Sequence, residues 1–112
     1  MKPTTATLTL FVAVGKANGK PCTRRDIARF DEAILNGSVE LAHGCDYAVN
    51  STTWSAPRLD GDWIVAEVEV EVEAYADKPM TPTTLAQVVD NDVGCFTPDA
   101  FEVVSVTAEP AA

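Results

Sequence analysis

The clearest pattern along the chain is an alternation of valine and glutamate within residues 63–75. Successive side chains of a β-strand point to opposite faces, so a period of two separates the valines from the glutamates. Glu67, Glu69, Glu71 and Glu73 then share one face. The pattern predicts a strand with one face in the core and one face in water.

Three further strands are predicted from β-branched and aromatic residues. Residues 5–14 alternate, and their even positions from residue 8 onward are apolar. Residues 47–55 are rich in Thr, Val and Trp. Residues 101–108 form the last predicted strand, and residues 109–112 are expected to be a frayed tail.

Start and stop residues mark a first helix. Thr23 is the predicted N-cap, and Asp26 three residues later gives a weaker form of the capping box. Apolar residues then recur at helical spacing until the Asn-Gly pair at residues 36–37, which ends helices. Residues 38–46 leave two structures open, an extension of the helix after a kink or a short extended piece.

A second helix is predicted to begin with Thr81 as N-cap and Pro82 at the first helical position, where the missing N–H costs nothing. It is expected to end within residues 91–94. The order β-α-β-β-α-β predicts an α+β, ferredoxin-like fold, in which two helices cover one face of a four-stranded antiparallel sheet. The other face of the sheet is open. We expect a single domain over residues 1–112.

Composition narrows the class of protein. A chain of 112 residues with 46% hydrophobic residues suits one modest core, which excludes a large multi-domain enzyme. A net charge of −9 excludes an ordinary basic nucleic-acid binder. Three unclustered cysteines favour a reducing compartment, and no apolar run approaches the ~18 residues of a membrane span. We therefore expect a cytoplasmic protein.

The charge is divided unevenly between the two halves of the chain. Residues 1–58 carry a net charge of +2, whereas residues 59–112 carry −11. Glutamates two apart on a strand lie roughly 6.5–7 Å from each other, and such a row repels itself. It is either a solvated face or a surface for a basic partner. Its spacing resembles that of successive phosphates on a nucleic-acid strand.

The turn between the two middle strands sets which residues accompany the glutamates. If Asp60 and Gly61 form a two-residue hairpin turn, Trp63 lies opposite Arg58. The same register predicts the facing pairs Trp54 with Glu67, Thr52 with Glu69, and Asn50 with Glu71. The open face would then carry an apolar patch of Trp54, Trp63 and Val65 at one end, of the kind that anchors protein–protein contacts.

Other candidate chemistry is sparse. Arg24 and Arg25 occupy the first turn of the first helix, where the helix dipole disfavours cations, so they are either a secondary basic patch or an ordinary exposed helix end. His43 and Cys45 are close enough in sequence to form a nucleophile pair. No paired C-x-x-C spacing or phosphate-binding loop is present, so we expect no metal and no cofactor.

These features predict a small acidic binding module that inhibits a basic, nucleic-acid-handling protein by charge mimicry. We expect no catalytic residues, no direct binding to nucleic acid and no binding to membranes. The predicted partner-binding residues are Glu67, Glu69, Glu71, Glu73, Asp60, Asp62, Trp54 and Trp63.

In size, charge and lack of a catalytic set, the chain resembles the phage and mobile-element proteins that inhibit nucleic-acid-handling machines, such as anti-restriction and anti-CRISPR proteins. Two alternatives stay open. One is a homo-oligomer, with a homodimer as its simplest form, that hides the open sheet face. The other is a small cytosolic enzyme that uses His43 and Cys45.

Overall fold

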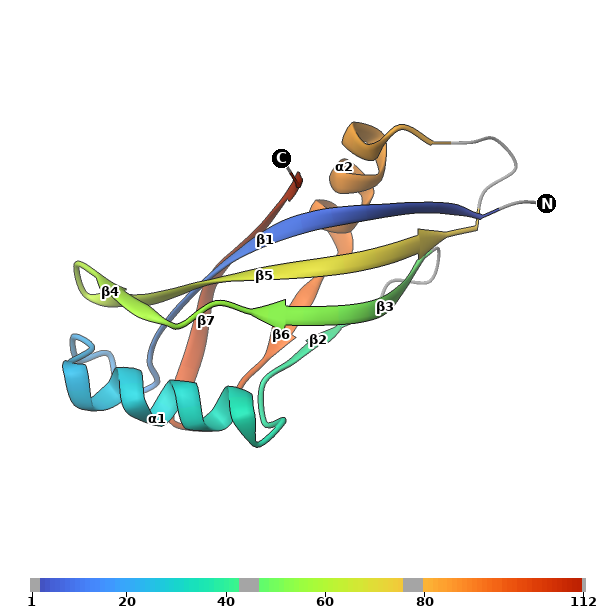
Figure 1. Ribbon diagram of the computed structural model, residues 1–112. Helices are drawn as coiled ribbons and strands as arrows, with labels where there is room; N and C mark the ends of the chain where they lie inside the picture. The colour runs from blue at the N-terminus through green and yellow to red at the C-terminus, as the bar shows by residue number, and fades with distance from the viewer. Residues whose placement is uncertain (1–2, 43–46, 76–79, 112) are drawn as a thin grey trace.

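A computed structural model describes residues 3–42, 47–75 and 80–111, which form an α+β fold with two helices and mostly antiparallel sheet (Figure 1). The elements in chain order are β1 (Thr4–Lys16), α1 (Arg24–Leu35), β2 (Glu40–Ala42), β3 (Tyr47–Trp54), β4 (Arg58–Asp60), β5 (Trp63–Ala74), α2 (Pro82–Asp92), β6 (Gly94–Phe96) and β7 (Phe101–Pro110).

The main sheet has five strands. Its order is β3-β5-β1-β7, and β4 pairs with the start of β5 beyond the end of β3. The strands β2 and β6 pair with each other in a separate two-stranded sheet. Helix α2 packs against β7 and β1, whereas α1 lies near β4 at one end of the molecule (Figure 1).

The predicted ferredoxin-like arrangement is wrong in strand number and in the order of elements. The prediction had four strands, and it did not include the three-residue strands β4 and β6. The three-residue strand β2 lies in residues 38–46, where a short extended piece was one of the two open alternatives. A strand of three residues is too short to show a period of two. In addition, α1 lies near β4 at one end of the molecule (Figure 1), and its Phe30 packs edge-to-face on Phe101 of β7 at a ring separation of 5.3 Å.

The pairing of β1 with β5 builds the centre of the core. Leu10 lies opposite Val68 and Leu8 opposite Val70, and all four side chains are buried. The intervening Glu69 is exposed. The predicted alternation of buried valines and exposed glutamates is therefore confirmed.

Both helices begin and end close to the predicted residues. Helix α1 ends at Leu35, and Gly37 adopts a φ of 73°, a left-handed conformation that suits glycine. Helix α2 begins at Pro82, and the hydroxyl oxygen of Thr81 accepts a hydrogen bond from the Thr84 N–H at 3.1 Å. Local capping signals therefore fixed both helix starts.

The C-terminal strand is longer than predicted. Glu109 and Pro110, expected in a frayed tail, belong to β7 and lie opposite Thr9 and Leu8 of β1. The N–H of Ala111 also donates to the Thr7 carbonyl at 3.1 Å. Pairing with β1 therefore continues to the last described residues.

The core register gives a matched stability test. Leu10→Ala removes a side chain that is 1% exposed and should lower the free energy of unfolding by about 2–5 kcal/mol. Leu35→Ala makes the same chemical change at a side chain that is 79% exposed and should change it by less than about 0.5 kcal/mol. Urea unfolding of both variants checks this, and equal losses would contradict the assigned core.

Candidate functional site

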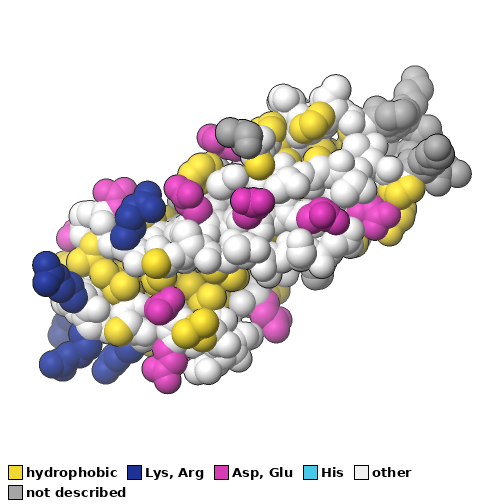
Figure 2. Space-filling model, viewed as in Figure 1, with side chains coloured by type: hydrophobic (Ala, Val, Ile, Leu, Met, Phe, Trp, Pro, Cys, Tyr) yellow, Lys and Arg dark blue, Asp and Glu magenta, His cyan; other side chains and the backbone are white. Residues whose placement is uncertain are grey.

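The open face of the main sheet carries the acidic row formed by Glu67, Glu69, Glu71 and Glu73. Glu69 and Glu71 are exposed, and Glu67 and Glu73 are half-buried. In Figure 2, acidic side chains follow the long dimension of the sheet. The four carboxylates thus form one continuous acidic row.

The side chains beside the acidic row are mostly short. From β1, the residues opposite the four glutamates are Phe11, Thr9, Thr7 and Thr5. From β3, Thr53 and Ser51 lie opposite Glu69 and Glu71. Because hydroxyl side chains are shorter than glutamate, they leave the carboxylates of Glu69 and Glu71 uncovered.

Within the described residues, no Lys or Arg lies within ion-pair distance of the acidic row. Among the residues that the structure describes, the only Lys or Arg within 4.0 Å of a carboxylate is Lys16, beside Asp26. Glu73 accepts a hydrogen bond from the Asn50 side-chain amide at 3.3 Å. Figure 2 instead shows Lys and Arg side chains gathered at the end of the molecule where α1 begins.

An apolar patch adjoins one end of the acidic row. Trp63 lies on the same face of β5 as the glutamates and is 46% exposed. Its indole covers Gly15 so closely that an added Cβ there would lie 2.7 Å from Trp63 Cζ3. Val104, 47% exposed, is also next to Gly15. The predicted aromatic anchor at Trp63 is therefore on the acidic face.

A hollow of about 300 Å³ lies between this patch and the acidic row. Phe11, 36% exposed, lines it beside Glu67, and Arg58 and Asp60 line it from β4. Phe11 is not among the residues predicted for the site. The signal was present, because Phe11 follows Thr5, Thr7 and Thr9 in the polar phase of β1.

Contrary to the prediction, Trp54 does not share the face of the acidic row. The hairpin turn is Gly61-Asp62, because Asp60 pairs with Trp63 and Gly61 has a φ of 62°. Trp54 lies opposite Val68, and Arg58 lies opposite Val65. Between these two pairs the chain has three residues, 55–57, on one side and only two residues, 66–67, on β5. This extra residue reverses the faces of residues 51–54 relative to the prediction, and the register shift at Asn50 restores the predicted register for residues 47–49.

The observed pairs on β3 therefore replace the predicted ones. Trp54 lies opposite Val68 instead of Glu67, Thr52 opposite Val70 instead of Glu69, and Asn50 is the extra residue where the register shifts. On β4, Arg58 lies opposite Val65 instead of Trp63. Asp60 and Asp62 are exposed, and Asp60 shares the face of Trp63.

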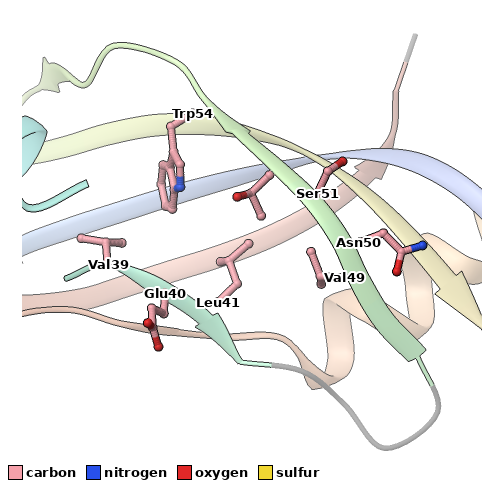
Figure 3. Close-up of a pocket in the computed structure, with 8 residues that line it drawn as sticks. Val39, Glu40, Leu41, Val49, Asn50, Ser51 and Trp54 are labelled. Carbon is pink, nitrogen blue, oxygen red and sulfur yellow. The ribbon is translucent and has the colours of Figure 1, made fainter. Parts of the chain in front are cut away.

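The reversed Trp54 borders a second hollow, of about 370 Å³, between β2 and β3. Val39, Leu41, Val49 and Trp54 point toward the gap between the two strands, and Glu40 lies at its rim (Figure 3). Trp54 also borders, with Glu67 and Glu69, a smaller hollow of about 210 Å³. The tryptophan therefore lies at the sheet edge, next to both faces.

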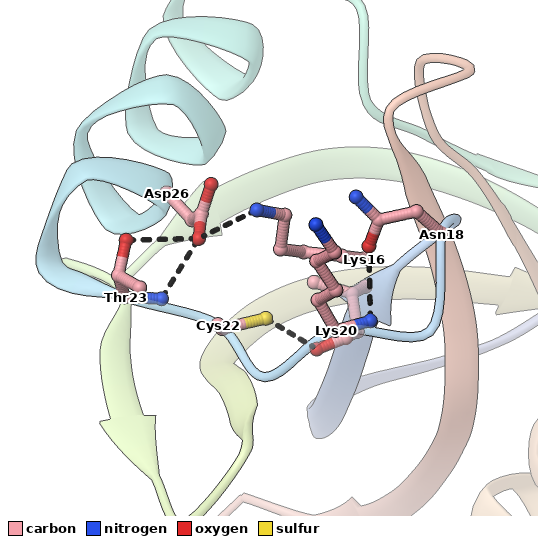
Figure 4. A network of polar contacts seen from close by, with 7 residues as sticks. Lys16, Asn18, Lys20, Cys22, Thr23 and Asp26 are labelled. Carbon is pink, nitrogen blue, oxygen red and sulfur yellow. Dashed lines mark hydrogen bonds and ion pairs between the residues drawn. The ribbon is translucent and has the colours of Figure 1, made fainter.

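The predicted basic patch lies at the start of α1, next to a buried carboxylate. Arg24 and Arg25 are exposed in its first turn. The buried Asp26 carboxylate accepts hydrogen bonds from the Thr23 N–H at 2.8 Å and the Thr23 hydroxyl at 3.0 Å, and Lys16 lies 3.6 Å away (Figure 4). The Thr23 hydrogen bonds and Lys16 hold the Asp26 pKa below its ordinary value. A carboxylate that remains ionised counteracts the adverse placement of the two arginines.

The thiols within the described residues are not activated. Burial raises the pKa of Cys95 to about 11, and burial together with the nearby Asp26 raises the pKa of Cys22. A thiol with a raised pKa is a weak nucleophile. His43 and Cys45, the predicted alternative pair, lie outside the described residues. The described His, Cys, Asp and Glu side chains form no group of three suited to a metal ion.

Comparison with protein-family models, with curated proteins and with solved structures gave no match to this chain. Within the described ranges, neither helix has the length and apolar character needed to span a membrane. The candidate site therefore stands on its own geometry, which combines an acidic row, an adjoining hollow and an exposed tryptophan.

The contact of Trp63 with Gly15 gives a test of the aromatic anchor. Gly15→Ala should displace the indole, since the new Cβ would lie 2.7 Å from it, and should increase acrylamide quenching of Trp63. A Trp54→Phe background leaves one tryptophan to report. Thr7→Ala, on the same strand and face, is the control and should leave quenching unchanged. Equal quenching in all three proteins would contradict the contact.

The Asp26 contacts predict a pH-dependent effect on stability. The pKa of Asp26 is lower in the folded protein than in the unfolded chain, where it is near 3.8. Ionised Asp26 therefore stabilises the fold fully at pH values above 3.8, and this contribution is lost as the pH falls through the native pKa. Asp26→Asn should therefore destabilise the protein at pH 7 and cost progressively less below pH 3.8. Urea unfolding at pH 7 and pH 3 measures this. The exposed Asp31→Asn on the same helix should show little effect at either pH.

Proposed function

We propose that this protein is a binding module that docks its acidic face on a basic surface of a nucleic-acid-handling protein and inhibits that protein by charge mimicry. The observation that carries the proposal is the acidic row, whose carboxylates have no described Lys or Arg within ion-pair distance. A groove that binds nucleic acid exposes lysines and arginines to a phosphate backbone. A row of carboxylates presents negative charges to such a groove at regular intervals, as a phosphate backbone does.

The parts of the site have separate roles in this proposal. The acidic row acts at long range, because charges that face solvent steer the encounter of oppositely charged proteins. Trp63 acts at contact, where burying an exposed indole slows dissociation. The hollow beside Phe11 gives space for a partner side chain next to Glu67. Association should therefore depend on salt, and residence time should depend on Trp63.

Reversing two charges tests the acidic row directly. The double variant Glu69→Lys/Glu71→Lys should abolish capture of a basic nucleic-acid-binding protein and leave the fold intact, because both side chains are exposed. The matched control is Asp31→Lys/Glu32→Lys, which makes the same change of net charge on the exposed face of α1. Capture from a host extract at low and raised salt, followed by competition with single-stranded nucleic acid, is the measurement.

The expected pattern has four parts. The captured protein is lost at raised salt, lost with the sheet-face variant, retained with the α1 variant and released by nucleic acid. If capture is equally strong with Glu69→Lys/Glu71→Lys, the acidic row is a solvated face and the proposal is wrong. If both double variants lose capture equally, net charge rather than the acidic row directs binding, which also contradicts it.

A further inference from the structure

The hollow beside Phe11 exists because short side chains lie next to longer ones on the open face of the main sheet. Val65, Ala13 and Ser105 lie side by side on β5, β1 and β7. In the next row along the same strands, Glu67 lies beside Phe11. All five residues line the hollow of about 300 Å³. The short side chains therefore form its floor, and Phe11 and Glu67 form one of its walls.

Three charged side chains line this hollow without forming an ion pair. Arg58 and Asp60 line it from β4, and Glu67 lines it from β5. Among the described residues the one ion pair is Lys16 with Asp26, so Arg58 lies more than 4.0 Å from both carboxylates of the hollow. The hollow thus keeps one cation apart from two anions, and its lining has a net charge of −1. One additional monovalent cation would neutralise it.

The uncharged groups of the lining suit a flat cation. The side chain of Phe11 is 36% exposed, and a guanidinium group stacks favourably on an aromatic ring. Ser105 and Thr107 are exposed and line the hollow from β7, where their hydroxyl oxygens can accept hydrogen bonds. A guanidinium carries N–H donors around its edge, so it can bond to carboxylate and hydroxyl oxygens while one face lies on the ring.

Arginine fits this lining better than lysine. Both side chains have an apolar stem that can lie on Val65 and Ala13, so the difference is in the head group. The ammonium group of lysine is a compact, strongly hydrated charge with no flat face. It is attracted by Glu67 as a guanidinium is, but it lacks the planar face that stacks on Phe11 and the forked donors that match a carboxylate.

The size and place of the hollow connect it to the acidic row. Pockets for small molecules have volumes of roughly 300–1,000 Å³, so this hollow is at the lower end of that range and suits one side chain. Glu67 is both a wall of the hollow and the first glutamate of the acidic row. A basic segment that lies along the acidic row therefore brings one of its side chains to the hollow.

We propose that the hollow beside Phe11 binds one arginine side chain of the basic partner, with the guanidinium stacked on Phe11 and paired with Glu67. This inference rests on the proposed function, because it names the side chain through which the basic partner meets this end of the acidic row. It adds a preference for arginine over lysine, which attraction between net charges alone does not produce.

Two peptides of equal charge test this preference. One is hexalysine, and the other is hexalysine with its third lysine replaced by arginine. Both should bind the full-length protein at low salt through the acidic row. The arginine peptide should bind about fivefold more tightly, because only the guanidinium gains the stacking contact with Phe11. Calorimetric titration of the protein with each peptide measures the two dissociation constants.

Two pairs of matched variants assign the preference to the hollow. Phe11→Leu removes the ring and should make the two peptides bind equally, whereas Phe96→Leu makes the same change at a side chain that is 65% exposed outside the hollow and should leave the preference intact. Glu67→Gln should weaken the arginine peptide more than the lysine peptide. Glu73→Gln, at the other half-buried glutamate of the acidic row, should weaken both peptides equally.

Chemical-shift mapping locates the arginine on the native protein. The ring protons of Phe11 and the methyl group of Ala13 should shift more with the arginine peptide than with hexalysine. Equal affinity of the two peptides for the native protein, or a preference that survives in Phe11→Leu, would overturn the inference.

The variant Glu69→Lys/Glu71→Lys separates this inference from the proposed function. If the native protein binds both peptides equally and the variant loses both, the acidic row binds by charge alone and only the arginine site fails. If the native protein prefers arginine but the variant binds both peptides as tightly as the native protein does, the hollow binds arginine and the role of the acidic row fails. If neither peptide binds the native protein at low salt, both proposals are wrong.

Discussion

The antiparallel pairing of β1 with β5 is the contact on which the rest of the structure depends. Its register, from Thr4–Ala74 to Val14–Ile64, sets the leucines of β1 against valines of β5 on the inner face. The same register sets threonine against glutamate on the outer face. A slip of one residue would bury the acidic row and expose the core, so one pairing determines both the fold and the candidate site.

The acidic row is tolerated by the fold and does not stabilise it. Neighbouring carboxylates roughly 7 Å apart repel each other by about 0.6 kcal/mol in water, or about 2 kcal/mol for the row before salt screening. A buried valine contributes about 1.5–3 kcal/mol, and Val68, Val70 and Val72 are all buried on the same strand. Core burial therefore outweighs the repulsion. A basic partner would relieve it, which gives the row a physical reason to bind cationic surfaces.

The elements that could be predicted from sequence are those set by local signals. The alternation in β5, the Thr23 and Thr81 caps and the glycine after α1 each act within a few residues. The pairing of β2 with β6 could not be predicted, because these three-residue strands pair across more than 50 residues of chain. The face of Trp54 depended on one extra residue within 55–57, and composition does not determine that count.

The central claim is that the acidic face steers the protein to a basic partner. The most direct measurement is the association rate constant with the captured partner as a function of ionic strength. For the native protein the rate should fall steeply as salt rises, because the Debye length shortens to about 8–10 Å near physiological salt. Replacing Glu69 and Glu71 by glutamine should flatten that dependence and slow association at low salt. An unchanged salt dependence in that variant would contradict the account.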